Sequence, residues 1–226
     1  MFFRRKVIDT VYVGEVAYSY ERKRERTNRW RIERQVVERL IAGIPWGSTV
    51  CDISAGMGRW LEKYNERGFT VKLIDASADM LMQANERAEA LSQGKFEFEV
   101  STVVRDGVLT DRHEYFIITN FVNWITLPDF NILLDNIRRS SLRHGFVMIS
   151  YRNNDLGFVS RILFETGVVW RNIKSDLGFR DKGRYNIYNF NEIMAIFGDN
   201  RFIVIKEHTV RTGRRINSIF EVTKMA

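Results

Sequence analysis

The 226-residue sequence contains a single cysteine, Cys51, and two prolines, Pro45 and Pro128. One thiol excludes an intramolecular disulfide framework and any zinc site built from several thiolates. No uncharged apolar run reaches the roughly 18 residues that a membrane-spanning helix needs, and residues 1–15 lack the apolar stretch of a signal peptide. We therefore expect a soluble, cytoplasmic protein that neither binds a metal nor enters a membrane.

The composition is that of a globular protein, with 45% hydrophobic and 28% charged residues. This balance excludes a disordered, collagenous or coiled-coil chain. The net charge is +7, and residues 1–40 contribute +5 of it, from eleven basic and six acidic side chains. A basic terminus can bind phosphate, as in a nucleic acid, but a solvated helix face with Arg–Glu pairs is the commoner outcome of such a run.

Short apolar strands alternate with helical patterns along most of the chain. Such alternation, with strands apolar on both faces, is typical of a parallel sheet covered by helices on both sides. We expect helices over residues 27–44, 60–68, 79–91, 129–140 and 190–197, and strands over 49–53, 69–74, 96–104, 115–121, 145–150, 201–208 and 215–223.

The C-terminal part departs from this alternation. Residues 154–187 contain many aromatics and glycines and are predicted to be irregular, and the last two strands are joined by a hairpin turn at 212–214. The predicted fold is therefore a doubly wound, mostly parallel α/β sheet that ends in an antiparallel strand. We expect one domain over residues 27–226, with a lid-like insertion at about 154–187 and an N-terminal arm over 1–26 that closes over the site.

The ends of the first two strands carry the clearest chemistry. Ligands of such sheets bind beyond the carboxyl ends of the strands. The loop from Asp52 to Arg59 contains Gly56 and Gly58, which would let the backbone approach a ligand closely. Asp75 ends the next strand, 19 positions after Gly56, where an acid typically accepts the hydroxyls of a ribose. The alternatives are that the glycine loop is only a tight turn and that Asp75 only caps the next helix. Together, however, the two features favour an adenosine ligand.

The spacing differs from a dinucleotide fingerprint, which is Gly-x-Gly-x-x-Gly. Here the loop reads Ser54-x-Gly56-x-Gly58, and Asp52 precedes it within the strand. A carboxylate at this place would repel a pyrophosphate and suits a ligand with an ammonium or sulfonium group.

At these residues the sequence resembles the class I S-adenosylmethionine-dependent methyltransferases. Val50–Arg59 is similar to the family's first motif, Val71–Leu81 to its second, and Ile117–Ile125 to its fourth-strand motif. The resemblance covers about residues 28–224 and implies a seven-stranded sheet with S-adenosylmethionine as cofactor. It implies cofactor contacts at Asp52, Ser54, Ala55, Gly56, Gly58, Arg59, Asp75, Ala76, Met80, Thr102, Val103, Asn120 and Phe121.

Two departures from the family pattern matter. Ser54 replaces the first motif glycine, and a serine is tolerable there if its φ is negative. The acid that often follows the third strand falls by spacing on Ser101-Thr102, while Asp106 comes four residues after Thr102, and the sequence does not decide between these positions. The fourth-strand motif also lacks the prolines that mark methylation of exocyclic amines on nucleic-acid bases.

Transfer of a methyl group needs positioning above all, with a base for some acceptors. His113 and His144 precede strands and so fall at the wrong end of the sheet, and we expect both to be solvated. The weak catalytic candidates are Tyr18 in the aromatic arm, Asn123, Tyr151, Arg152, which could hold an anionic substrate, and His208 at the end of a strand.

The sequence therefore predicts a methyltransferase that moves a methyl group by in-line displacement to an O or N atom of a small molecule. The basic N-terminus supports an RNA or DNA methyltransferase as the alternative. A non-catalytic S-adenosylmethionine-binding scaffold is the second alternative, motivated by Ser54, Met57 and the lack of an obvious base.

Overall fold

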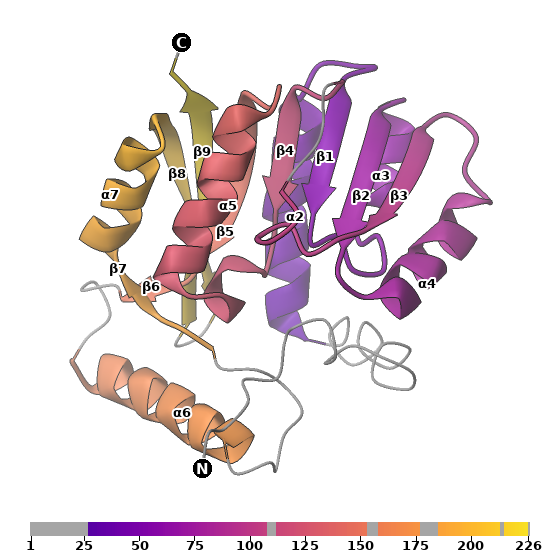
Figure 1. Cartoon of the computed structure of the whole chain (residues 1–226). Coiled ribbons are helices and arrows are strands. Elements are labelled where there is room, and N and C mark those ends of the chain that lie inside the picture. Colours follow the sequence, from indigo (N-terminus) through magenta and orange to yellow (C-terminus); the bar gives the residue numbers. More distant parts are fainter. Residues whose placement is uncertain (1–26, 108–111, 153–157, 177–184, 213–214, 226) are drawn as a thin grey trace.

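A seven-stranded sheet runs through the computed structural model, which describes residues 27–107, 112–152, 158–176, 185–212 and 215–225 (Figure 1). Its strand order is β3-β2-β1-β4-β5-β9-β8, with β9 antiparallel to both neighbours and the other pairs parallel. The predicted fold is confirmed. Chain order reverses between β1 and β4, which is where such sheets bind ligands. The strands are β1 (Thr49–Ile53), β2 (Thr70–Asp75), β3 (Lys95–Val100), β4 (Tyr115–Ile118), β5 (His144–Ile149), β8 (Phe202–Thr212) and β9 (Arg215–Lys224).

Helices cover both faces of the sheet. One core cluster joins α5 and α7 to the front face in Figure 1, and the other joins α2, α3 and α4 to the opposite face. Both clusters are built from strand residues that alternate in direction, such as Cys51 and Ile53 on one face and Val50 on the other. The helices are α2 (Asn28–Gly43), α3 (Leu61–Glu66), α4 (Ala78–Ala88), α5 (Leu127–Arg139) and α7 (Phe190–Asp199).

Three of the helices, α2, α4 and α5, begin at side chains that satisfy their free N–H groups. Thr27 Oγ1 accepts from the N–H of Trp30 at 3.2 Å, and Ser77 Oγ accepts from that of Met80 at 3.3 Å. Thr126 and Asp129 form a reciprocal capping box at the start of α5. The start of the first helix and the cap at Ser77 are therefore confirmed.

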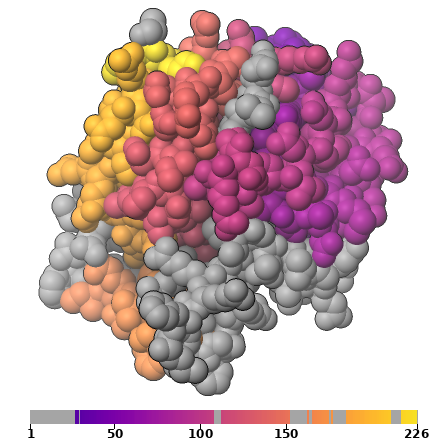
Figure 2. All heavy atoms as spheres, in the orientation of Figure 1, coloured from indigo at the N-terminus to yellow at the C-terminus, as the bar shows by residue number. Residues whose placement is uncertain are grey.

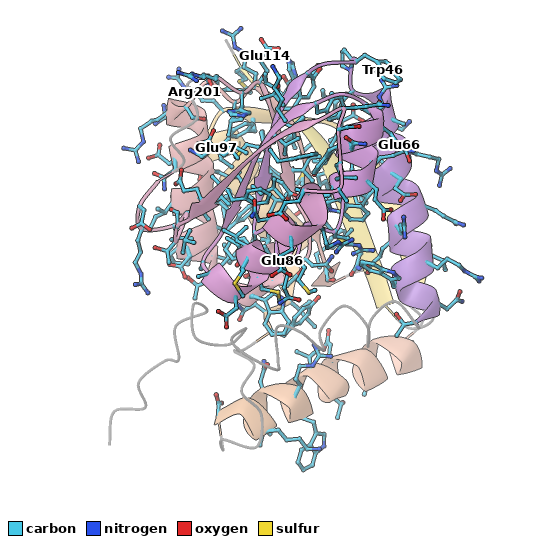
Figure 3. All side chains as sticks on the ribbon, turned by 90° about the vertical axis from the view of Figure 1, so that its right-hand side faces the viewer. Trp46, Glu66, Glu86, Glu97, Glu114 and Arg201 are labelled. Carbon is cyan, nitrogen blue, oxygen red and sulfur yellow. The ribbon has the colours of Figure 1, made fainter. Side chains whose placement is uncertain are left out.

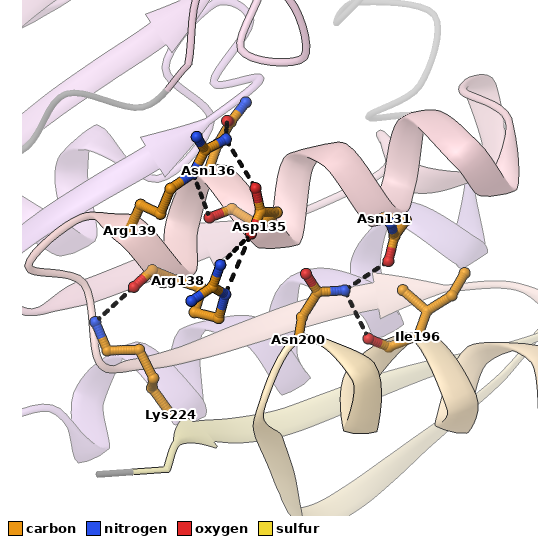
Figure 4. Close-up of polar contacts among 8 residues, drawn as sticks. All are labelled: Asn131, Asp135, Asn136, Arg138, Arg139, Ile196, Asn200 and Lys224. Carbon is orange, nitrogen blue, oxygen red and sulfur yellow. Dashed lines mark hydrogen bonds and ion pairs between the residues drawn. The ribbon is translucent and has the colours of Figure 1, made fainter.

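Polar contacts fasten α5 to α7 and to the last strand (Figure 4). Asn200 Nδ2 donates to Asn131 Oδ1 at 2.7 Å, and Lys224 Nζ donates to the carbonyl of Arg138 at 3.1 Å. Asp135 forms surface ion pairs within α5, at 2.5 Å to Arg138 and 2.8 Å to Arg139. This side of α5 thus has a structural role.

Two predicted strand ends come too late in the chain, and both errors enlarge the loops at the carboxyl edge. The third strand ends at Val100 instead of residue 104, and the fourth ends at Ile118 instead of residue 121. A 3₁₀ turn, η2 (Val122–Trp124), follows β4. Residues 101–104 and 119–121 therefore lie in loops beside the expected ligand.

The segment predicted to be irregular contains a 19-residue helix, α6 (Phe158–Asp176). It lies at the lower left of Figure 1, below the short strands β6 and β7, and forms the lower left of the surface in Figure 2. Two short strands, β6 (Tyr151–Arg152) and β7 (Tyr188–Asn189), pair next to it. The arm over residues 1–26 and the turn at 213–214 lie outside the described residues.

The opposite edge of the sheet lies away from α6. Figure 3 shows Trp46, Glu114 and Arg201 at the end of the molecule farthest from that helix. These residues precede β1, β4 and β8, so this is the amino edge of the sheet. Among the described residues, no helix combines the length and apolar character needed to cross a membrane.

Candidate functional site

The turn after β1 has left-handed backbone at three alternate positions. Ser54, Gly56 and Gly58 have φ values of 62°, 58° and 69°. The φ of Ser54 is positive, so the condition under which a serine is readily tolerated here is not met, because the turn repeats the same conformation at each alternate residue. Ala55 anchors the turn by donating its N–H to the carbonyl of Ile74 at 3.0 Å. Left-handed backbone costs a serine energy that a glycine avoids.

The two glycines of this turn serve different purposes. A Cβ on Gly56 would meet no protein atom within 4 Å, so the backbone borders open space. A Cβ on Gly58 would lie 2.3 Å from Leu61 Cδ1 and 3.1 Å from Ala84 Cβ. The open space at Gly56 is compatible with the predicted close approach of a ligand. Gly58 also allows the turn to pack against α3 and α4, and its predicted contact with the ligand stays a prediction.

Asp75 lies at the carboxyl end of β2 and faces the same turn. Its Oδ2 accepts from the N–H of Gly56 at 2.8 Å, and its Oδ1 accepts from that of Ser77 at 2.9 Å. Burial raises the pKa of the Asp75 carboxyl, while these N–H groups and the Ser54 side chain oppose the shift. The carboxylate thus accepts from Gly56, Ser77, Ser54 and Ala76, and its side chain stays partly exposed beside the turn. The partly exposed group thus fits the two hydroxyls of a ribose.

Asp52 is buried in β1, with 1% of its surface exposed. Its Oδ2 accepts from the Tyr64 hydroxyl at 3.0 Å, and Oδ1 has no hydrogen-bond partner among the described residues. Burial raises the pKa of Asp52 to about 7, against the hydrogen bond from Tyr64, and the charge of Asp75 adds to the rise. A nearby cation would favour the ionised form, so this carboxyl fits a ligand with a sulfonium group.

The loop after β3 brings both positions that the sequence left open into one turn. Asp106 Oδ2 accepts from the Thr102 N–H at 2.8 Å, from the Thr102 hydroxyl at 2.6 Å and from Ser101 Oγ at 3.4 Å. Ser101 in turn donates its N–H to the carbonyl of Asp75 at 3.0 Å. The turn therefore adjoins the end of β2, and the carboxylate of Asp106 lies on it.

The other expected cofactor contacts border the same edge. Ala55, Met80, Val103 and Phe121 are buried apolar side chains at the ends of neighbouring elements, and Ala76 directly follows Asp75. Asn120 follows β4 with a φ of 59°, a conformation that asparagine tolerates better than most residues. The sheet topology thus gathers the expected set at one edge.

Arg59 lies between two tryptophans. Its guanidinium carbon is 3.2 Å from the ring centroid of Trp30 and 4.3 Å from that of Trp60. Arg59 Nη2 donates to the carbonyl of Trp30 at 3.2 Å, and Nη1 is 3.7 Å from the buried carboxylate of Glu33. Its position links the turn after β1 to α2.

The catalytic candidates fall in different places. The Asn123 carboxamide donates to the carbonyls of Ser150 and Asn186, at 2.6 and 2.8 Å, and accepts from the Ser150 N–H at 2.8 Å. It therefore holds two loops together. Tyr151 donates its hydroxyl to Glu207 Oε1 at 2.7 Å. Tyr18 and the side chain of Arg152 lie outside the described part of the structure.

His208 is not at the end of its strand. β8 continues to Thr212, and His208 lies opposite Ile219 of β9, with Nε2 3.3 Å from Glu221 Oε2. His113, expected to be solvated, is buried. Burial lowers its pKa, and it precedes β4 at the amino edge. His144 is exposed, as expected, and begins β5.

Sequence reasoning missed three buried polar residues that are linked by hydrogen bonds. Glu33, Ser150 and Asn217 contact one another or Tyr185 across separations of 35 to 184 residues. Such distant pairs leave no local pattern in a sequence. No group of three metal-ligating side chains occurs within the described ranges.

These features place an open turn and two carboxyl groups at the switch point of a Rossmann-like sheet. Residues 50–145 match the family model described as a methyltransferase domain. No curated protein sequence matches the chain. The match over these residues and the seven-stranded sheet agree with the resemblance to the class I S-adenosylmethionine-dependent methyltransferases.

Several solved structures share the fold at low sequence identity. Magnesium protoporphyrin IX methyltransferase from Synechocystis PCC 6803, solved with S-adenosylhomocysteine, has a TM-score of 0.71 at 17% identity, over 95% of this chain and 97% of that one. Geranyl diphosphate C-methyltransferase from Streptomyces coelicolor A3(2) has a TM-score of 0.65 at 13% identity, over 98% and 91%. A phosphoethanolamine N-methyltransferase from Haemonchus contortus has a TM-score of 0.68 at 15% identity, over 96% and 58%.

Proposed function

We propose that this protein transfers a methyl group from S-adenosylmethionine to an O or N atom of a small-molecule acceptor. The observation that carries the proposal is the Asp75 carboxylate, which lies partly exposed at the switch point and accepts the Gly56 N–H of the turn after β1. The solved relatives that contain S-adenosylmethionine or S-adenosylhomocysteine support the same cofactor.

The cofactor, when bound, supplies a methyl group activated by its sulfonium. The protein's own residues bind and orient it. Asp75 accepts the ribose hydroxyls, the open backbone at Gly56 adjoins the ligand, and Asp52 provides a carboxyl that gains charge beside a cation. Displacement at carbon needs the acceptor in line behind the methyl group, so positioning supplies most of the rate.

A small-molecule acceptor is supported by the structural relatives, which are methyltransferases of a magnesium porphyrin, geranyl diphosphate and a phosphoethanolamine. We propose that α6 is part of a roof over the acceptor, because it lies on the carboxyl side of the sheet, next to β6 and β7 (Figure 1). The arm over residues 1–26 remains part of this proposal as a second lid, and it lies outside the described residues.

The test uses S-adenosylmethionine with a deuterated methyl group and two fractions of a cell extract, one of small molecules and one of nucleic acids. We expect S-adenosylhomocysteine to form and the label to appear in the small-molecule fraction. Label in the nucleic-acid fraction, with activity that falls steeply as salt rises, would support the alternative of an RNA or DNA methyltransferase. Tight cofactor binding without any S-adenosylhomocysteine formed would support a scaffold.

A further inference from the structure

A chain of buried polar side chains connects the turn after β1 with the segment that follows α6. The Tyr185 hydroxyl donates to Ser150 Oγ at 2.8 Å, and Ser150 donates to Asn217 Oδ1. Asn217 Nδ2 donates to Glu33 Oε1 at 2.6 Å. Tyr185, Ser150, Asn217 and Glu33 have only 5%, 2%, 1% and 0% of their surfaces exposed.

One end of this series of buried side chains lies beside the turn after β1, where the cofactor is proposed to bind. Glu33 lies on α2, and its Oε2 is 3.7 Å from Nη1 of Arg59. Arg59 directly follows Gly58 in the turn after β1 and packs between Trp30 and Trp60. A shift of this turn therefore acts directly on the charge partner of Glu33.

The other end of the series, Tyr185, is hydrogen-bonded to α6. Asn172 of α6 accepts the Tyr185 N–H at 2.9 Å and donates to the Tyr185 carbonyl at 3.0 Å. Arg171 of the same helix lies 5.0 Å from the centroid of the Tyr185 ring, and Trp124 meets that ring edge-on at 5.2 Å. Tyr185 thus joins α6 to the loop after β4.

The hydrogen bonds of this series of buried side chains all point the same way, from Tyr185 towards Glu33. Glutamate accepts only, so Asn217 must present its NH₂ to Glu33 and its oxygen to Ser150. Ser150 must then donate to Asn217, which leaves its own oxygen to accept from Tyr185. Buried polar groups are costly when unpaired, so loss of any member disturbs the others. Such a chain favours a single arrangement of its two ends.

We propose that Tyr185 is a positioning residue, through which the buried chain from Arg59 holds α6 and Trp124 in place when the cofactor is bound. This inference rests on the proposed function, since it assigns the cofactor to the turn that carries Arg59. Trp124 and α6 border the carboxyl edge where the acceptor would lie, so the chain couples cofactor binding to the shape of the acceptor side.

The test is hydrogen–deuterium exchange of residues 158–176, with and without S-adenosylhomocysteine, in the wild type, Tyr185→Phe and Tyr188→Phe. Tyr188 is a matched control, because it lies in the same segment, is equally buried, and donates its hydroxyl to the carbonyls of Val122 and Ile125 and not to Ser150. S-Adenosylhomocysteine affinity is measured by calorimetry in parallel.

We expect S-adenosylhomocysteine to slow exchange in α6 of the wild type and of Tyr188→Phe, and to leave it unchanged in Tyr185→Phe. Affinity should stay within about threefold in Tyr185→Phe, because the substituted group is distant from the ligand. Equal protection in Tyr185→Phe and the wild type would overturn the inference, as would equal loss in both variants. Binding without protection in the wild type would overturn the inference alone, whereas no binding would overturn the proposed function as well.

Discussion

The N–H of Gly56 donates to Oδ2 of Asp75 across 2.8 Å, although the two residues are 19 positions apart in the chain. This bond joins the turn after β1 to the end of β2, so the two features that the sequence associates with an adenosine ligand contact each other. Asp75 therefore fixes the turn, and we propose that it also contacts the ribose of the cofactor.

Replacement of Asp75 by alanine should weaken binding of S-adenosylhomocysteine by roughly 1–3 kcal/mol, the cost of losing charge-assisted hydrogen bonds. Asp135→Ala is the control, because it removes a carboxylate of α5 that forms only surface ion pairs. Calorimetry on both folded variants checks the prediction. Unchanged affinity in Asp75→Ala would refute the assignment of Asp75 to the ribose.

Gly56→Ala should abolish tight cofactor binding, because its methyl group would enter the open space beside the turn. It should also destabilise the fold by about 1–2 kcal/mol, since alanine is strained at positive φ. Binding is measured by calorimetry and stability by urea denaturation.

Gly47→Ala separates these two effects. Gly47 has a φ of +70° and open space around its Cβ position, but it precedes β1 at the amino edge. Its substitution should cost similar stability and leave cofactor affinity unchanged. If both variants bound equally well, Gly56 would serve the turn alone.

Gly58→Ala should lower stability more than either of these substitutions. Its Cβ would overlap Leu61 at 2.3 Å and crowd Ala84 at 3.1 Å, in addition to the strain of a φ of +69°. The midpoint of urea unfolding measures the effect. A midpoint equal to that of Gly47→Ala would show that the contact with Leu61 relaxes without cost.

Ser54 tests the strain of the turn directly. Both Ser54→Gly and Ser54→Ala lose the side-chain hydrogen bond to Asp75, but only alanine retains a side chain at the φ of 62°. We expect the glycine variant to be more stable than the alanine variant by about 1 kcal/mol. An alanine variant of equal or greater stability would mean that this backbone stores no strain.

Asp52 makes stability depend on pH. Its pKa is about 7 in the folded protein, against an ordinary value of 3.8, so the folded state holds the proton more tightly than the unfolded state does. Asp52 therefore contributes at most about 4 kcal/mol to the free energy of unfolding below about pH 4, and this contribution is lost as the pH rises to about 7. Urea denaturation of Asp52→Asn between these pH values should show a smaller fall in stability than the wild type shows. Parallel pH profiles would contradict the raised pKa.

The sheet could be predicted because its strands are continuous apolar runs separated by helical patterns. α6 could not, because apolar residues lie on both its sides. Val168 is buried, whereas Ile162, Val169 and Trp170 are about half exposed, so the segment lacks the polar face by which an amphipathic helix is identified.

The site could be predicted in part, for a similar reason. Asp75 and Gly56 form a local pattern of known spacing, and the structure brings them together. The left-handed φ of Ser54 could not be predicted from a residue that usually avoids that conformation. The contact between Glu33 and Asn217 spans 184 residues, and it becomes visible only once α2 packs beside the C-terminal hairpin.

The most direct test of the account is a pair of calorimetric titrations of the wild-type protein, one with S-adenosylhomocysteine and one with NADH. Both ligands contain an adenosine, but only NADH places a pyrophosphate beside the turn that Asp52 precedes. The account predicts saturable binding of one S-adenosylhomocysteine per chain and no binding of NADH. Binding of NADH without binding of S-adenosylhomocysteine would contradict it.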